Sequence, residues 1–193
     1  MPRARRPSNQ FRIIAGRWRG RRLEFPALPG IRPSSDRVRE TLFNWLQDRI
    51  VGARCLDLFA GSGALGLEAL SRQAAQVVFV DREARALHAI GEHLARLGTA
   101  PDAAERVRSE ALNYLGGMPR VFDIVFLDPP FSEPLLRPCL EALLPDWLAP
   151  GWRVYAEAPA PLGAPPEGAT LLRETRAGRV WAGLLGAEPA KHL

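Results

Sequence analysis

A glycine-rich segment directly after a predicted strand constrains the fold of this chain more than any other feature. The apolar stretch 54–59 predicts a strand, and it runs into Gly61-Ser62-Gly63-Ala64-Leu65-Gly66, after which the pattern is helical. The glycines permit a sharp turn and allow backbone N–H groups to approach a ligand closely. A second predicted strand, 76–80, ends at Asp81, twenty residues after Gly61. This order is typical of one half of a doubly wound α/β sheet.

A second stretch, Val121–Phe131, combines a buried strand with an abrupt stop. Its apolar run V-F-D-I-V-F-L is typical of a strand covered on both faces, and it ends at Asp128-Pro129-Pro130-Phe131. Neither proline can donate to a strand ladder, and each restricts the residue before it to extended conformations. The sequence therefore predicts a carboxylate, two carbonyl groups and an aromatic ring held at the carboxyl end of a strand, where open α/β sheets bind their ligands.

The remaining periodicity predicts further strands and helices around these two motifs. A final hairpin turning at Ala177-Gly178 is not expected of an all-parallel dehydrogenase sheet, and the class that we predict is α/β. The expected helices cover residues 36–50, 82–97 and 135–144, and the expected strands cover residues 11–15, 21–25, 106–109, 152–157, 170–175 and 179–185.

Arginine is concentrated at the start of the chain. Residues 1–40 hold eleven arginines against three acidic residues, a net charge of +8, whereas the rest of the chain sums to −3. Guanidinium groups suit bidentate phosphate contacts and stacking on bases, so this asymmetry favours a nucleic-acid partner. A genomic preference for arginine over lysine would explain the residue type but not the clustering.

The first predicted hairpin carries Arg17, Trp18 and Arg19 at its tip, between two glycines. We interpret this tip as a nucleic-acid finger that combines phosphate neutralisation with a stacking surface. The alternative is an ordinary hairpin with Trp18 folded back onto the core. The RNA-binding residues that we predict are Arg12, Arg17, Trp18, Arg19, Arg21, Arg22, Arg32 and Arg37.

Length and composition exclude several other classes. The 193 residues suit one domain with a small extension, and no apolar run approaches the roughly 18 residues of a transmembrane helix. The arginine-rich start lacks the apolar region of a signal peptide, so we expect a cytoplasmic protein. Cys55 and Cys139 lie in apolar stretches without metal-ligand spacing, and His88 and His93 do not share a helical face, so we expect no metal site.

Two enzyme classes fit the glycine-rich loop. The pattern G-x-G-x-x-G followed by Asp81 matches an NAD-binding fingerprint, but no acid or base for hydride transfer presents itself. Asp57, four residues before Gly61, would face a cationic group more readily than a pyrophosphate. S-adenosylmethionine is cationic and carries a ribose diol, and for this cofactor Asp57 supports the amino-acid end, Asp81 accepts from the ribose and Glu110 contacts the adenine.

The Asp128 motif supplies an acceptor site that S-adenosylmethionine, as a methyl donor, would require. An exocyclic amine of a nucleobase is a weak nucleophile because its lone pair is delocalised into the ring. The Asp128 carboxylate and the Pro129 carbonyl can accept its two N–H groups and orient the amine for attack on a methyl group, while Phe131 stacks on the base. The methyltransferase hypothesis is therefore the one that uses every motif.

Three segments also resemble a known family. They are R-P-S-S-D-R-V-R-E-T-L-F-N-W-L at residues 32–46, L-D-L-F-A-G-S-G-A-L-G-L-E-A-L-S-R at residues 56–72, and D-P-P-F at residues 128–131. In these the chain is similar to the bacterial RsmD-type 16S ribosomal RNA guanine-N2 methyltransferases, from about Phe11 to Leu185. The resemblance implies a Rossmann-like class I methyltransferase fold with a seven-stranded mixed sheet ending in an antiparallel hairpin. It also implies S-adenosylmethionine as methyl donor and guanine 966 of 16S ribosomal RNA as target, within an assembling small subunit.

The site and domain predictions follow from these motifs. We expect a disordered basic tail at 1–10, an RNA-binding hairpin at 11–31, a methyltransferase domain at 32–187 and a tail at 188–193, acting as a monomer. The rivals are an adenine-N6 methyltransferase of DNA or RNA and a non-catalytic RNA-binding assembly factor. The predicted catalytic residues are Asp128, Pro129, Pro130 and Phe131, and the predicted cofactor-binding residues are Asp57, Phe59, Ala60, Gly61, Ser62, Gly63, Asp81, Arg82, Glu110, Ala111 and Asp128.

Overall fold

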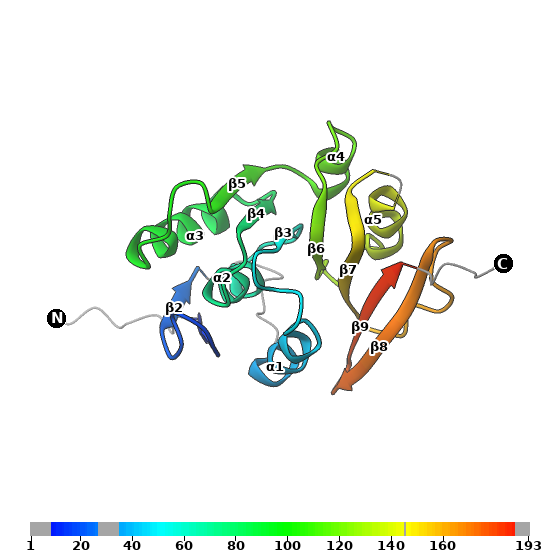
Figure 1. Cartoon of the computed structure of the whole chain (residues 1–193), viewed down its shortest axis with the longest axis horizontal. Helices are drawn as coiled ribbons and strands as arrows, with labels where there is room; N and C mark the ends of the chain where they lie inside the picture. The colour runs from blue at the N-terminus through cyan, green and yellow to red at the C-terminus, as the bar shows by residue number, and fades with distance from the viewer. Residues whose placement is uncertain (1–8, 27–34, 145, 188–193) are drawn as a thin grey trace.

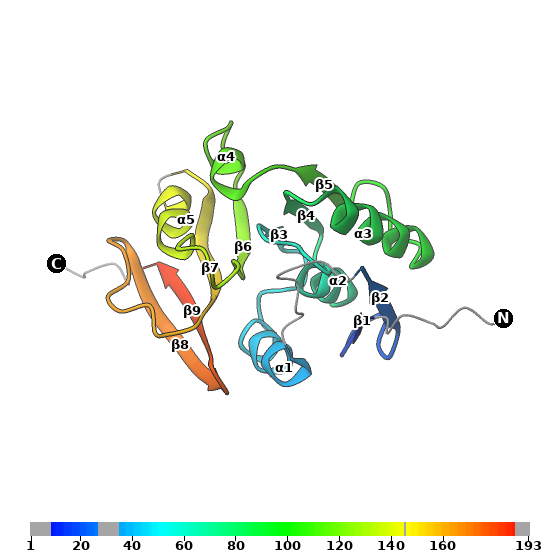
Figure 2. The ribbon, with the colours of Figure 1, turned by 180° about the vertical axis from the view of Figure 1, so that it is seen from behind.

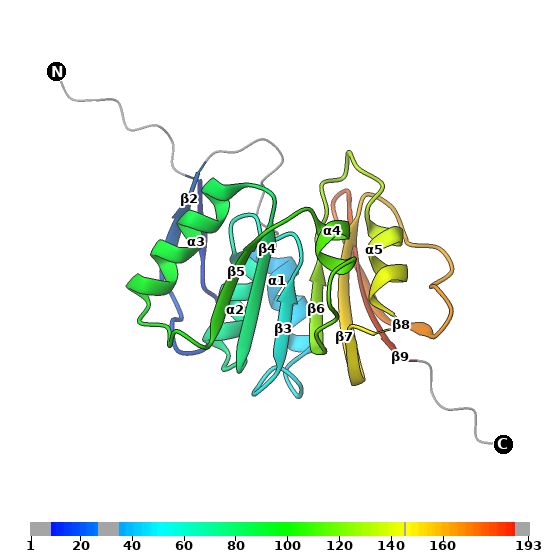
Figure 3. The same ribbon diagram turned by 90° about the horizontal axis from the view of Figure 1, so that it is seen from above.

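A seven-stranded mixed sheet organises the computed structural model, which describes residues 9–26, 35–144 and 146–187. Its strand order is β5-β4-β3-β6-β7-β9-β8, and Figure 3 shows these strands side by side from β5 at one edge to β8 at the other. The first five strands in this order pair in parallel, whereas β9 is antiparallel to both β7 and β8. The strands are β3 (Arg54–Asp57), β4 (Gln76–Asp81), β5 (Ala104–Arg108), β6 (Phe122–Leu127), β7 (Leu148–Ala158), β8 (Ala169–Ala177) and β9 (Val180–Ala187).

Helices cover both faces of the sheet because the central strands are apolar on both sides. One core cluster joins the sheet to α1 (Asp36–Trp45), α2 (Ala64–Ser71) and α3 (Ala84–Arg96). The other cluster lies against α4 (Ala111–Leu115) and α5 (Leu136–Leu143). Figure 1 shows α1 and α2 on one side of the sheet and α5 on the other. The predicted α/β class with a terminal antiparallel hairpin is confirmed.

Successive side chains along a strand belong to opposite core clusters, as the alternation of strand geometry requires. Within β6, Ile124 and Phe126 belong to the α1 side, whereas Val125 and Leu127 belong to the α5 side. Each of these four side chains is at most 1% exposed. The predicted continuous apolar strand is therefore fully covered.

A separate two-stranded sheet forms the N-terminal extension, with β1 (Asn9–Arg12) antiparallel to β2 (Arg22–Phe25). Figure 2 shows this hairpin beside α2 and α3. Phe11 and Phe25 are buried on its inner face, with ring centroids 6.2 Å apart. The extension therefore contributes to the main core instead of standing apart from it.

The hairpin begins earlier and ends sooner than the sequence predicts. Asn9 and Gln10 pair with β2, so these two residues belong to the hairpin, whereas residues 1–8 of the expected tail lie outside the described residues. At the other end, the backbone N–H groups of Ile14 and Ala15 turn away from the ladder and donate to the carboxylate of Glu68 on α2, at 2.8 and 3.0 Å. The buried Glu68 carboxylate thus accepts two N–H groups that would otherwise pair with the opposite strand.

Other boundaries differ modestly from those expected. The helix predicted over 36–50 ends at Trp45, and the residues after it form a turn that still buries Leu46 and Ile50. Helix α4 has five residues and was not predicted, since so short a segment carries little periodicity. Ser35 caps α1, and its hydroxyl accepts the Val38 N–H at 3.4 Å.

Candidate active site

The two predicted motifs meet at the point where the strand order reverses. Strand β3 lies between β4 and β6, so the connections from β3 and β6 leave the sheet in opposite directions. Asp57 is in register with Phe126, and the Leu58 N–H donates to the Phe126 carbonyl at 3.2 Å. Asp57 and Asp128 therefore end two neighbouring parallel strands, at the crevice where doubly wound sheets bind ligands.

The glycine-rich loop adopts a conformation that glycine favours. Gly61 and Gly63 have φ angles of 49° and 78°, and Gly63 is the N-cap residue of α2. A β-carbon at Gly63 would lie 2.8 Å from Cγ1 of Ile90. The loop thus packs tightly on α3 while turning the backbone toward the start of α2, an arrangement that lets a ligand approach main-chain N–H groups.

Asp57 holds the start of α2 from inside the protein. Its side chain is 2% exposed, and Oδ2 accepts the Gly66 N–H at 3.0 Å. Burial raises the pKa of the Asp57 carboxyl to about 7, a shift that the Gly66 hydrogen bond opposes and the nearby Asp81 increases. Asp57 therefore supports the loop, and its carboxylate would gain from a cationic group bound nearby.

Asp81 connects the loop to the following helix. Its Oδ2 accepts the Gly61 N–H at 2.7 Å, and its Oδ1 accepts the Glu83 N–H at 2.8 Å. The side chain remains half-buried at the carboxyl end of β4. Both oxygens are thus oriented by the backbone, which is the preorganisation that a ribose-binding carboxylate needs.

Arg82 pairs with Glu110 and also with Glu133, a residue that the sequence did not single out. Arg82 forms an ion pair with Glu133 (Nη2 to Oε1, 3.0 Å) and a longer one with Glu110 (Nη1 to Oε2, 3.9 Å). These contacts link the ends of β4 and β5 to the loop after β6, and the Glu133 carboxylate raises the pKa of Arg82. Ala111 directly follows Glu110 and is buried, with its side chain in the core cluster on the α5 side of the sheet.

The residues after β6 form one wall of an open cleft. Asp128 and Pro130 are half-buried and Pro129 is buried, while Phe131 is 45% exposed and therefore accessible for stacking. The cleft has a volume of about 220 Å³. Its lining comprises Pro129, Pro130, Phe131, Glu133, Pro134, Leu136, Arg137, Glu157, Ala158, Pro159, Ala160, Pro161 and Leu162.

The structure corrects the interpretation of Trp18 as an exposed stacking surface. Trp18 is only 6% exposed and belongs to the core cluster, and the Arg17 guanidinium lies over its ring at 4.6 Å. The alternative prediction, a tryptophan folded onto the core, is the one observed. The predicted arginines of the described hairpin and of α1 are exposed, namely Arg12, Arg17, Arg19, Arg21, Arg22 and Arg37, whereas Arg32 lies outside the described residues.

A buried polar network that was not predicted attaches the hairpin to α2. The Ser71 hydroxyl donates to the Ala15 carbonyl at 2.6 Å and accepts the Trp18 N–H at 3.0 Å. The fully buried Glu68 carboxylate takes two hairpin N–H groups and also the Nε–H of Arg72 at 2.8 Å. A glutamate and a serine within an otherwise apolar helical segment were the signal that sequence reasoning could have used.

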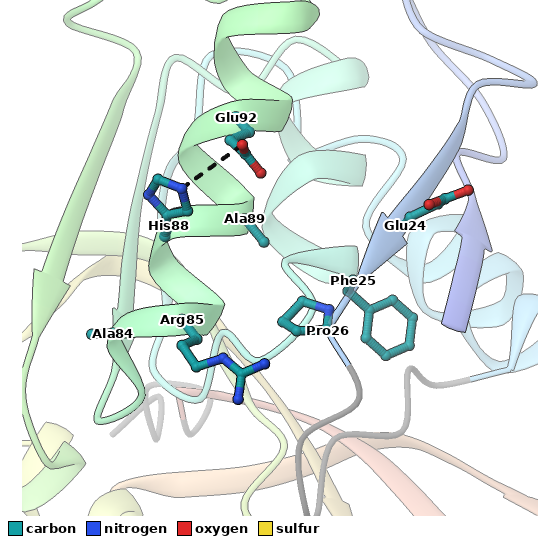
Figure 4. A pocket seen from close by; sticks show the side chains of 8 residues that line it. All are labelled: Glu24, Phe25, Pro26, Ala84, Arg85, His88, Ala89 and Glu92. Atoms are coloured by element: carbon teal, nitrogen blue, oxygen red, sulfur yellow. Dashed lines mark ion pairs between the residues drawn. The ribbon is translucent and has the colours of Figure 1, made fainter. Parts of the chain in front are cut away.

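The hairpin is also tied to α3. The His93 imidazole lies 2.7 Å from the Glu24 carbonyl through Nε2, and burial lowers its pKa, so the ring stays neutral and donates Nε2–H. Glu24 also lines a cavity of about 650 Å³ between the hairpin and α3 (Figure 4). It is lined by Glu24, Phe25, Pro26, Ala84, Arg85, His88, Ala89 and Glu92.

Among the described residues, neither a membrane-spanning helix nor a metal-binding cluster is present. None of their helices is long and apolar enough to cross a membrane. In the same part of the chain, no group of three or more His, Cys, Asp or Glu side chains could hold a metal ion. Cys55 and Cys139 are free and buried, as expected of core residues.

Strand order and loop geometry together define the class of this protein as a Rossmann-like methyltransferase fold. The structure of SMU.776 complexed with SAH has the same fold, with a TM-score of 0.65 at 16% identity over 86% of this chain and 54% of that one. The antiparallel β8–β9 pair sets this sheet apart from the all-parallel sheet expected of a dehydrogenase.

The chain belongs to the family described as Conserved hypothetical protein 95, whose match covers residues 11–184. It is 46% identical to the protein of Escherichia coli strain K12 named ribosomal RNA small subunit methyltransferase D, over 90% of this chain and 88% of that protein. The solved structure of yhhF from Escherichia coli is 44% identical, with a TM-score of 0.84, and covers 93% of this chain and 99% of that one. The resemblance predicted from the motifs is thereby confirmed.

Proposed function

We propose that this protein transfers a methyl group from S-adenosylmethionine to the exocyclic N2 amine of a guanine in the RNA of the small ribosomal subunit. The observation that carries the proposal is the placement of the glycine-rich loop and Asp128-Pro129-Pro130-Phe131 at the carboxyl ends of two adjacent strands. Family membership and the name of the Escherichia coli relative support a ribosomal RNA substrate. The target position, guanine 966, rests on the motif resemblance alone.

The donor side of the site fits S-adenosylmethionine. When bound, this cofactor supplies an electrophilic methyl group on a sulfonium. Asp57 stabilises the loop and favours positive charge beside it, Asp81 offers oriented carboxylate oxygens, and the positive φ of Gly61 and Gly63 brings backbone to the crevice. SAH, the demethylated form of this cofactor, is bound by a protein of the same fold.

The acceptor side provides what a weakly nucleophilic amine requires. The Asp128 carboxylate and the Pro129 carbonyl accept the two N–H groups, which localises the nitrogen lone pair and orients it. Phe131, being exposed at the cleft, stacks on the base. The proton released after methyl transfer passes to Asp128 or to water.

RNA is held largely by the N-terminal region. The exposed arginines of the hairpin neutralise phosphates, while the Glu68 and Ser71 contacts hold the hairpin in one position relative to α2. Since helix α2 starts at the cofactor loop, the bound RNA and the cofactor share one rigid support. The protein acts as a monomer on assembling small subunits, in the cytoplasm.

The test is to incubate the protein with radiolabelled S-adenosylmethionine and small-subunit particles, and then to map the modified nucleotide. The proposal expects a single N2-methylguanosine. Methylation of adenine N6 would identify the rival methyltransferase, and RNA binding without methyl incorporation would identify an assembly factor. Calorimetric titration with S-adenosylmethionine and with NAD checks the donor independently of the RNA.

A further inference from the structure

A second carboxylate, Glu157, lies next to Asp128 at the carboxyl ends of the neighbouring strands β6 and β7. Leu127 of β6 is in register with Ala156 of the parallel strand β7, so the residues that follow them, Asp128 and Glu157, occupy adjacent positions. Because side chains alternate along a strand, both carboxylates lie on the face that Phe126 and Tyr155 share. The strand ends thus place two acids side by side at the candidate acceptor site.

Glu157 is buried and yet lines the cleft beside Phe131. Its exposure is 3%, and it is among the residues that form the cleft wall with Pro129 and Pro130. The Tyr155 hydroxyl donates to Oε1 of Glu157 at 2.8 Å, and burial together with Glu157 raises the pKa of Tyr155 well above its usual value. The tyrosine therefore remains a protonated donor that orients the carboxylate, as expected of a buried acid with a defined role.

Guanine and adenine differ at the ring nitrogen beside the exocyclic amine. In guanine this nitrogen, N1, carries a hydrogen and donates, whereas in adenine it has a lone pair and accepts. Asp128 and the Pro129 carbonyl recognise only the amine, so they serve both bases equally. A carboxylate adjacent to Asp128 would accept the N1–H of guanine and would repel the N1 lone pair of adenine.

We propose that Glu157 is the residue that selects guanine, by accepting N1–H of the base whose N2 amine is held by Asp128. This assignment rests on the proposed methyltransferase function and adds the base specificity that the Asp128 motif by itself lacks. Tyr155 is a positioning residue, since it acts through Glu157.

The decisive substrate replaces the target guanine by 2-aminopurine, which keeps the N2 amine but has no hydrogen on N1. Wild-type protein is expected to methylate the guanine RNA about 100-fold more efficiently, measured as kcat/KM with radiolabelled S-adenosylmethionine. Equal rates on the two RNAs would overturn the role of Glu157 without any variant. Absence of methylation of the guanine RNA, with assembled particles as well, would instead contradict the proposed function.

The matching variant is Glu157→Gln, because an amide can accept from N1–H or donate to an N1 lone pair. We expect its preference for guanine over 2-aminopurine to fall from about 100-fold to below about 10-fold, mainly because kcat/KM falls on the guanine RNA. Tyr155→Phe, which keeps the carboxylate but removes the hydroxyl that orients it, should lower the preference to a value between those of the wild type and Glu157→Gln. A merely structural Glu157 would lower both rates equally and leave their ratio unchanged, which would refute the assignment.

Discussion

The two halves of the site are built differently. On the donor side, at β3 and β4, the carboxylates of Asp57 and Asp81 accept backbone N–H groups of the glycine-rich segment and of α3. On the acceptor side, at β6 and β7, two consecutive prolines have no N–H to donate, and Phe131 is exposed at an open cleft. The donor side is therefore preorganised by internal hydrogen bonds, whereas the acceptor side presents groups to a base that arrives from outside.

The two sides bind different kinds of ligand, which explains why one relies on backbone hydrogen bonds and the other on exposed side chains. A cofactor that enters the same crevice in every cycle is well served by a loop whose shape is determined before binding. A base delivered by a large RNA needs accessible acceptors and a stacking surface. Substitutions on the two sides should consequently affect different steps.

The largest effect is expected from Asp128→Ala, which removes the proposed acceptor of the reacting amine. The methylation rate should fall by about 100- to 1000-fold, while S-adenosylmethionine affinity measured by calorimetry changes little, because the donor-side hydrogen bonds are untouched. Asp102→Ala, at an exposed aspartate of a distant turn, is the matched control. A near-normal rate for Asp128→Ala would contradict the assigned chemistry.

The next effect concerns stability and the buried acid of the donor side. The pKa of Asp57 is raised to about 7 from 3.8, so the folded state holds this proton more tightly than the unfolded state. Its contribution to stability is therefore complete below about pH 4 and is lost as the pH rises through about 7, a change on the order of 4 kcal/mol. Asp57→Asn should flatten this part of the pH profile of the unfolding free energy, measured by urea denaturation without cofactor. An identical slope in the variant would show that Asp57 ionises normally.

A smaller effect is expected from Asp81→Ala. The variant loses the acceptor of the Gly61 N–H and the oriented carboxylate, so the Kd for S-adenosylmethionine should rise about 30-fold. With saturating cofactor, the methylation rate should largely return, unlike that of Asp128→Ala. If the methylation rate of Asp81→Ala stays low at saturating S-adenosylmethionine, Asp81 also affects the acceptor side, and the two halves of the site do not act separately.

The smallest effect should come from the exposed arginines of the hairpin. Replacing Arg17 and Arg19 by alanine should weaken RNA binding about 10-fold and reduce the slope of log Kd against log salt by about 2. Arg173 and Arg176, two exposed arginines on β8 at the far edge of the sheet, provide the matched double variant. Equal losses for both pairs would argue against a dedicated role of the hairpin.

Much of the fold follows from patterns within short stretches of sequence. The strands around Cys55, Val78 and Val125 are apolar on both faces, which predicts a covered sheet, and all three side chains are fully buried. The glycine-rich loop and the Asp128-Pro129 stop were located for the same reason, since a turn conformation and a missing N–H are properties of the residues themselves. The predicted strand boundaries differed mainly where other elements supplied hydrogen-bond partners.

The candidate site was predicted only in part. The positions of Asp57, Asp81 and Asp128 at strand ends were expected, but the pairing of Arg82 with Glu133 joins residues 51 apart in the chain. Glu157 is the second-last residue of β7 and Asp128 directly follows β6, but their proximity depends on which strands pair and in which register. Periodicity carries no information on such pairings.

The sequence by itself determined the strand ends, the glycine turn and the family motifs, because these depend on the conformational limits of a few adjacent residues. Only the tertiary structure decided that Trp18 is buried and that Glu68 and Ser71 hold the hairpin through contacts across 53 to 56 residues. The physical reason is that a buried polar group must find its partner wherever packing places one, and an arginine-rich hairpin can stack its tryptophan outward or inward until the core is assembled. Adjacent residues therefore determine which positions carry the reactive groups, and packing determines which side chains surround them.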